Sequence, residues 1–199
     1  SCFEQALAAL GHLPETRERL EQAIDLRLDL RNSLFILAEL EKVRDHLRDA
    51  ERLARGLDDQ RRLGWVSLYI SHNSLVTGYS TEARASGQTA CTIAEALGDL
   101  PLQIGANIYL GAAYLACGDY RLAEGFLRKA MQPLEGDLTN ERFGMHGFPA
   151  VLSRFYLAWS LADRGVFDEA IAIGQDAVLG AEAINHAYSL VLACWRLGY

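Results

Sequence analysis

Small turn residues recur along the chain at a spacing of about 40 residues, and this regularity restricts the possible folds more than any other feature. Ala38, Gly78 and Gly118 follow one another at intervals of 40 residues, and Gly165 comes 47 residues later. Glycine adopts the backbone conformation that ends a helix without a steric penalty. The spacing therefore predicts a series of helix hairpins, each with its turn at one of these positions.

The residues around Gly118 indicate how such a hairpin packs. Ala123 and Ala130 follow the turn at helical spacing, and their small side chains allow two helices to cross closely. Tyr114 and Leu127 are bulky and fill the space beside that crossing. Similar patterns surround the other turns: Leu30, Leu34, Leu40, Val43, Leu47 and Ala50 around Ala38; Ile70, Ser71, Ser74, Ala83 and Ala90 around Gly78; and Leu157, Ala158, Leu161, Phe167, Ala170 and Ala177 around Gly165.

The composition favours helices throughout. Of all residues 50% are apolar and only four are proline, while Ala, Leu, Glu and Arg are abundant and form helices readily. We expect first helices near 14–34, 60–77, 101–117, 149–164 and 187–199, and second helices near 38–56, 81–97, 120–135 and 167–184. Asp58, Ser80 and Asp99 are placed to cap helices, and Pro14 and Pro149 suit a first helical turn.

These features resemble the tetratricopeptide repeat (TPR), whose motif is matched best by Leu110, Gly111, Tyr114, Gly118 and Ala123. The resemblance implies an all-α fold, a right-handed α-α superhelix of about four to five helix pairs, with repeats lengthened from about 34 to about 40 residues. It implies one repeat domain over 1–199. Its repeats are 1–12 (partial), 14–56, 60–97, 101–135, 149–184 and 187–199 (partial). We expect the chain to be a fragment of a longer protein.

Five stretches resemble the C-terminal TPR region of bacterial multidomain signalling proteins, in which a class III adenylate/guanylate cyclase domain precedes an AAA-type ATPase domain. They are residues 3–10, 13–19, 58–65, 141–144 and 193–199. This resemblance implies that the chain is the sensor or regulatory arm of a parent whose other domains bind ATP and form a cyclic nucleotide. No phosphate-binding G-x-x-x-x-G-K-[ST] loop occurs in the chain itself.

Charge and motif content argue against several classes of function. The net charge of −7 argues against a nucleic-acid partner, because phosphate binding requires a dense basic surface. No apolar run approaches the roughly 20 residues that span a bilayer. Four scattered cysteines favour a reduced, cytoplasmic setting, and the five histidines lack zinc-binding spacing. We therefore expect no catalytic, cofactor or metal site, no membrane partner and no enzymatic activity in this chain.

The first helices of a TPR array line its concave face. Counting back from each turn identifies the inward-facing positions. The candidate protein-binding residues are Asn32, Trp65, Leu68, His72, Ile108, Leu115, Phe155, Trp159, Asp163, Trp195 and Tyr199. They include all three tryptophans, and aromatic residues often anchor bound peptides. The alternative is that these aromatic side chains are buried as structural filler.

We expect a protein-interaction or scaffold module that binds a peptide or protein segment on its concave face. Two alternatives remain open: a structural arm that forms homodimers through exposed repeat ends, and a small-ligand sensor with an aromatic-lined pocket. The long connection at 136–148 is either a functional insertion or a loop that Phe143 and Phe148 pin to the stack.

Overall fold

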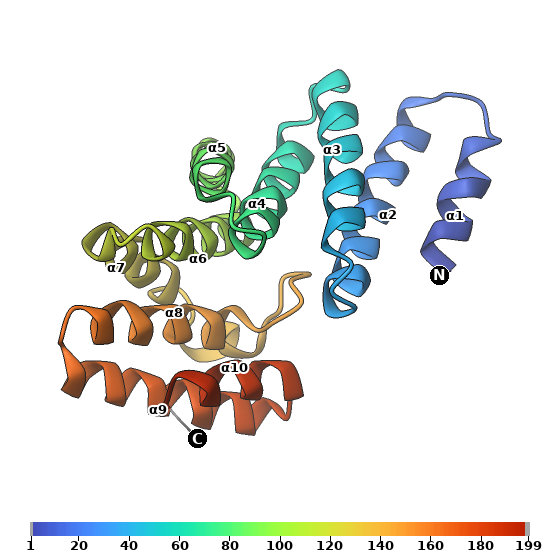
Figure 1. Cartoon of the computed structure of the whole chain (residues 1–199). Coiled ribbons are helices and arrows are strands. Elements are labelled where there is room, and N and C mark those ends of the chain that lie inside the picture. Colours follow the sequence, from blue (N-terminus) through green and yellow to red (C-terminus); the bar gives the residue numbers. More distant parts are fainter. Residues whose placement is uncertain (1, 198–199) are drawn as a thin grey trace. The chain divides into compact units, whose positions relative to one another are not determined.

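The computed structural model describes residues 2–197, and helices account for most of them (Figure 1). Within this range there are ten α-helices, one 3-10 helix and no strand. The α-helices are α1 (Cys2–Gly11), α2 (Arg17–Ile36), α3 (Leu40–Gly56), α4 (Gln60–Val76), α5 (Ser80–Leu97), α6 (Leu100–Ala116), α7 (Tyr120–Met131), α8 (Pro149–Asp163), α9 (Phe167–Ile184) and α10 (Ala187–Leu197). The 3-10 helix η1 spans Gly136–Asn140. The predicted all-α class is confirmed.

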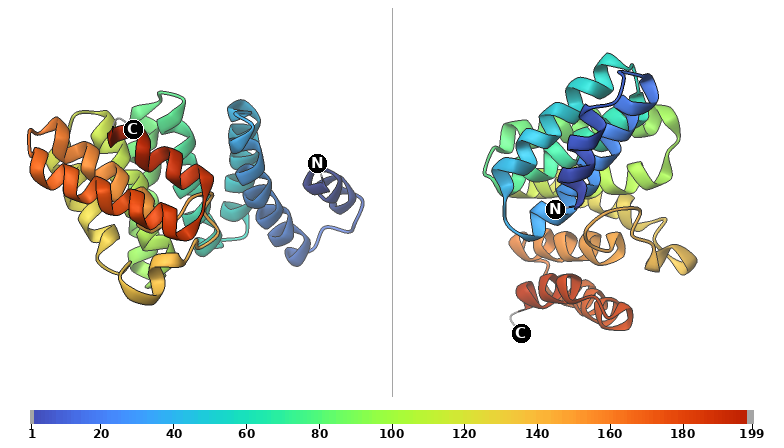
Figure 2. Two further views of the ribbon diagram at one scale, coloured as in Figure 1. Left: turned by 90° about the horizontal axis from the view of Figure 1, so that it is seen from below. Right: turned by 90° about the vertical axis from the view of Figure 1, so that its right-hand side faces the viewer.

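The helices group into two compact units, an N-terminal unit up to Gly98 and a C-terminal unit from Asp99. In the N-terminal unit, α2 pairs with α3 and α4 with α5, and α1 packs on α2. In the C-terminal unit, α6 pairs with α7 and α8 with α9, while α10 packs on both α8 and α9 (Figures 1 and 2). Because α2 also contacts α4, and α6 contacts α8, successive first helices are neighbours within each unit.

The first helices of the four hairpins end in the same way. Gly78, Gly118 and Gly165 have φ angles of +85°, +79° and +79°, and Ala38 has a φ angle of +57°. The backbone N–H that follows each of them reaches back five residues; Asp119 N, for example, donates to Tyr114 O at 3.0 Å. This hydrogen bond satisfies a carbonyl group that the helix end would otherwise leave unpaired. The predicted turn positions are confirmed.

The helices of a hairpin approach each other most closely at small residues. Gly111 on α6 faces α7, where an added Cβ atom would lie 2.8 Å from Leu127 Cγ and 3.2 Å from Ala123 O. Ala123 and Leu127 are fully buried. The same cluster continues to Leu115 and Leu157 in the neighbouring first helices. Small and large residues therefore have the roles that the repeat pattern predicts.

Two helix boundaries differ from the predicted ones by three residues or more. Helix α2 begins at Arg17 rather than near residue 14, because Thr16 is its N-cap and accepts a hydrogen bond from Arg19 N at 3.2 Å. Helix α7 ends at Met131 rather than near residue 135. Pro133 has no N–H group and cannot donate the backbone hydrogen bond that would continue the helix, so α7 stops short of this position.

The helix caps were predicted to within one residue. Asp99 caps α6 through its side chain, as predicted. At α4 the cap is Asp59, which accepts a hydrogen bond from Arg62 N at 2.9 Å, while Asp58 lies in the turn with a φ angle of +52°. Ser80 is the first residue of α5 and follows the cap position. The cap of α4 thus lies one residue after the predicted position, and the cap of α5, Tyr79, lies one residue before it.

Candidate functional site

Helix α8 places three of the candidate residues on one of its faces. Phe155, Trp159 and Asp163 follow one another at intervals of four residues, so their side chains lie one above the other along the helix. Phe155 is buried, Trp159 is half-buried and Asp163 is exposed. The face therefore runs from the apolar interior of the C-terminal unit to solvent.

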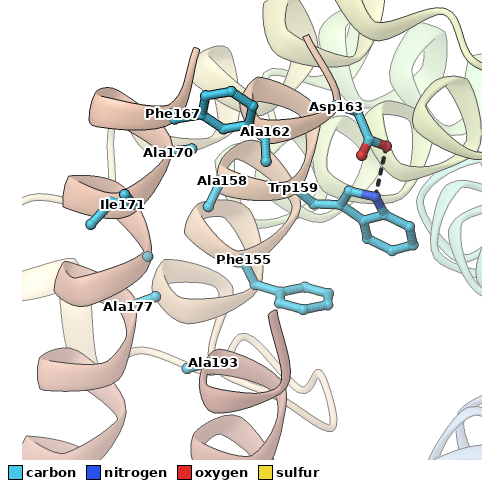
Figure 3. A pocket seen from close by; sticks show the side chains of 11 residues that line it. Phe155, Ala158, Trp159, Ala162, Asp163, Phe167, Ala170, Ile171, Ala177 and Ala193 are labelled. Carbon is cyan, nitrogen blue, oxygen red and sulfur yellow. Dashed lines mark hydrogen bonds between the residues drawn. The ribbon is translucent and has the colours of Figure 1, made fainter. Parts of the chain in front are cut away.

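An apolar pocket of about 150 Å³ opens beside this face (Figure 3). It is formed by α8, α9 and α10 and is lined by Phe155, Ala158, Trp159, Ala162, Asp163, Phe167, Ala170, Ile171, Gly174, Ala177 and Ala193. Small residues form most of its floor, which leaves room between the larger side chains. Asp163 is the only charged side chain among these lining residues.

Aromatic rings form one wall of the pocket. The Phe155 and Trp159 ring centroids lie 6.2 Å apart at an interplanar angle of 64°. Trp195 of α10 stacks on Phe155 with a centroid distance of 6.3 Å and an angle of 20°. Both separations fall in the range of favourable ring pairs. Three predicted site residues from two helices therefore make one continuous aromatic surface.

The indole of Trp159 is held in place by Asp163. Trp159 Nε1 donates a hydrogen bond to Asp163 Oδ2 at 2.9 Å. This bond restricts the rotation of the indole and places a carboxylate at the mouth of the pocket. On the opposite wall, Phe167 is 62% exposed and Ile171 is 50% exposed, so apolar surface extends outside the pocket. The arrangement suits an apolar side chain next to a hydrogen-bond donor.

Two arginines near the C-terminal end of α8, Arg128 and Arg164, are engaged with other acids. Arg128 pairs with Glu169 at 2.7 Å and with Glu124 at 2.9 Å, and Arg164 also pairs with Glu124. With the side chains that the structure describes, the carboxylate of Asp163 forms no ion pair. Among the described side chains, no arginine therefore pairs with the negative charge at the mouth of the pocket.

The other candidate residues of the C-terminal unit lie deeper. Ile108 and Leu115 are buried, and Leu115 belongs to the core cluster of α6, α7 and α8. Both side chains pack inside the helix stack and expose almost no surface that a bound peptide could contact. Tyr199 lies outside the described residues.

In the N-terminal unit, the candidate residues surround a buried arginine. Arg31 is fully buried, donates to Asn32 Oδ1 at 2.9 Å and contacts His72 Nδ1. Its guanidinium lies 4.8 Å from the ring centroid of Phe35 and 4.3 Å from that of Tyr69, which are cation–π distances. Asn32 and His72 therefore take part in an internal polar cluster. Leu68 is buried and Trp65 is half-buried.

Sequence reasoning missed Arg31, although a signal was present. Ile24 is fully buried on α2, and Arg31 follows it by seven residues, which is two helical turns and the same face. The arginine-rich, acid-rich sequence of α2 conceals this spacing. An arginine on the buried face of a helix, with aromatic side chains near enough to stack on it, indicates a buried cation.

The loop at 136–148 is anchored to the C-terminal unit. Phe148 is buried and packs beside α9 and α10. His146 Nε2 lies 3.0 Å from the Tyr188 hydroxyl, and its Nδ1 lies 3.5 Å from the Tyr109 hydroxyl. The guanidinium of Arg142 donates to two carbonyls of the loop and lies 5.7 Å from the Phe148 ring centroid. These contacts favour the structural interpretation of the loop.

The described part of the chain was also searched for metal sites and for membrane-spanning helices. Among the His, Cys, Asp and Glu side chains that the structure describes, no three come together as metal ligands would. None of the helices over the same residues has both the length and the apolar character that crossing a bilayer requires.

A solved structure has the same fold. No protein-family model matches the sequence, and the search of curated proteins found no match. The crystal structure of a Rap protein complexed with competence and sporulation factor is similar to this chain, with a TM-score of 0.73 and 17% sequence identity. The similarity covers 96% of this chain and 50% of that chain, so this chain spans about half the length of the Rap protein. At this identity the comparison confirms the fold, an α-α solenoid of stacked helix hairpins.

Proposed function

We propose that the chain is a protein-interaction module and that it binds a peptide or protein segment through the pocket of α8, α9 and α10. The observation that carries this proposal is the Trp159–Asp163 pair, which fixes an indole and a carboxylate at the mouth of an apolar pocket. A bound segment would insert one apolar side chain between Phe155, Trp159 and Ile171. Its backbone N–H groups or a basic side chain would donate to Asp163.

The size of the pocket favours a peptide side chain over a free small molecule. Its volume of about 150 Å³ lies well below the roughly 300–1,000 Å³ of typical small-molecule sites. Exposed Phe167 and Trp195 extend the apolar surface on both sides, as contacts for neighbouring residues of a peptide. The likeness to a Rap protein, which was crystallised in complex with a factor, is consistent with a binding role for this fold.

We further propose that this module is the sensor or regulatory arm of a bacterial cytoplasmic signalling protein. Its five sequence stretches that resemble cyclase and ATPase-linked TPR regions support this context. In such a parent, occupancy of the pocket would regulate a domain elsewhere in the protein. The reading frame that encodes the chain tests this context directly, because it shows whether cyclase and ATPase domains are present.

Selection of peptides from a random displayed library against the purified protein tests the binding function. We expect selected peptides to share a bulky apolar residue and to bind Trp159→Ala about 30-fold more weakly, which corresponds to about 2 kcal/mol. Leu122→Ala is the matched control, because Leu122 is an exposed apolar residue of α7 outside the pocket. Its affinity should equal that of the unmodified protein. Peptides that bind both variants equally well would refute the assignment of the pocket.

A further inference from the structure

The N-terminal unit contains a second cavity, which differs in character from the pocket of α8, α9 and α10. Its volume is about 330 Å³, and it lies between α1, α2 and α3. It is lined by Leu7, Leu10, Gly11, Glu15, Arg19, Leu20, Ala23, Arg27, Arg52 and Leu53. Leucine side chains from three helices provide its apolar part, and three arginines provide its polar part.

Arg27 is held at the wall of this cavity with little exposure to solvent. Its side chain is 18% exposed, and its Nη1 donates to Ala23 O at 2.8 Å. The nearest carboxylate oxygen, Asp49 Oδ2, lies 3.7 Å from Nη2, which is longer than a hydrogen bond. Arg27 Nε is buried and has no hydrogen-bond partner. A guanidinium has five N–H donors, so most of the donors of Arg27 lack a protein acceptor.

The acids around the cavity do not offset its arginines. Asp49 serves two cations, since it also lies 3.2 Å from Arg52. Arg19 donates to Leu13 O at 2.6 Å and lies 3.5 Å from Glu15, which is largely exposed. Three guanidinium groups therefore share two carboxylates, in a chain whose net charge is −7. The cavity therefore has a local excess of positive charge, although the chain as a whole is negatively charged.

Electrostatics support the same conclusion for Arg27. Burial lowers the pKa of Arg27, the Asp49 carboxylate raises it only in part, and Arg52 lowers it further. Burial and the nearby charge of Arg27 also lower the pKa of His46 on α3. The charged form of Arg27 is therefore less well stabilised than in water, and an anion in the cavity would stabilise it.

We propose that this cavity binds a small organic acid with an apolar body. Its carboxylate accepts hydrogen bonds from Arg27 and Arg52, which an arginine fork suits geometrically. Its apolar body lies against Leu7, Leu10 and Leu53. A cavity of about 330 Å³ is within the range of small-molecule sites, and its mixed lining matches an amphipathic ligand better than an inorganic ion.

Titration of the full chain with sodium benzoate, followed by NMR of the arginine Nε–H and leucine methyl signals, tests this proposal. We expect benzoate to shift the signals of Arg27, Leu7 and Leu53, and benzamide, its neutral counterpart, to leave them unchanged. Arg52→Gln should bind benzoate about tenfold more weakly or worse, because a charge-assisted hydrogen bond is lost. Arg52 is largely exposed, so this variant should fold normally.

Two controls make the result decisive. Arg121→Gln removes an exposed arginine of α7, in the other unit, and should leave benzoate affinity unchanged. Arg27→Gln should abolish binding, and its far-UV circular dichroism should show whether the helices are retained. Equal binding of benzoate and benzamide would overturn the proposal. So would benzoate affinity that is the same in Arg52→Gln as in the unmodified protein.

Discussion

Replacement of Gly111 by alanine probes the close approach of α6 and α7. In an open helix this change stabilises, because alanine has the higher helix propensity by about 1 kcal/mol. At Gly111, however, the new Cβ atom would lie 2.8 Å from Leu127 Cγ and 3.2 Å from the backbone oxygen of Ala123. Neither atom can move easily, since Leu127 and Ala123 are both fully buried.

The expected magnitude follows from these two opposing effects. Overpacking of a tight core site destabilises by about 1–3 kcal/mol. After the gain in helix propensity of about 1 kcal/mol, Gly111→Ala should lower the free energy of unfolding by about 1 kcal/mol. Gly125→Ala on α7 is the matched control, since an added Cβ atom there meets nothing within 4 Å. That variant should raise the free energy of unfolding by about 1 kcal/mol.

Urea unfolding monitored by far-UV circular dichroism measures both changes from the midpoint and slope of the transition. The double variant Gly111→Ala with Leu127→Ala should recover part of the steric penalty, and the double-mutant cycle gives its size. If Gly111→Ala stabilised the protein as much as Gly125→Ala does, α6 and α7 would not approach as closely as described. The roles given to small residues throughout the repeats would then be wrong.

The remaining predictions concern the N-terminal unit. Burial alone raises the pKa of Asp59, but hydrogen bonds from the backbone and guanidinium of Arg62 outweigh it, so its pKa lies below 3.8. Ionised Asp59 therefore contributes stability above pH 3.8 that is lost as the pH falls through its lower folded value. Asp59→Asn, which retains a capping side chain, should unfold more easily than the unmodified protein at neutral pH, and urea titrations should show this difference vanish in acid. Arg31→Lys should destabilise by about 1–3 kcal/mol in the same assay, because an ammonium cannot both stack on two rings and donate to Asn32 and His72.

The sequence predicts the hairpins well because their determinants are local. A residue with positive φ ends each first helix, and in three of the four hairpins an alanine five positions further on allows the second helix to cross. Both signals lie within one repeat and do not depend on the rest of the chain. The start of α2 after Thr16 and the end of α7 before Pro133 depend on single residues, so these boundaries were predicted less accurately.

The candidate site was predicted only in part. Phe155, Trp159 and Asp163 share a face because of helical periodicity, which the sequence reveals. Phe167 and Ile171, which form the opposite wall, depend on how α9 lies against α8. The cavity near Arg27 forms only where three helices meet. In the sequence, the arginines that line it cannot be distinguished from ordinary surface arginines. Such features arise from packing and cannot be derived from the period of one helix.

The turn at Gly118 and its counterparts closes with hydrogen bonds that use atoms of a single hairpin. A nascent chain leaving the ribosome can therefore form each hairpin once its second helix has emerged, without waiting for distant segments. Every completed hairpin then presents an apolar side on which the following one assembles. Synthesis and folding can thus advance together along the chain, and a stalled intermediate would hold ordered hairpins behind an unfinished end.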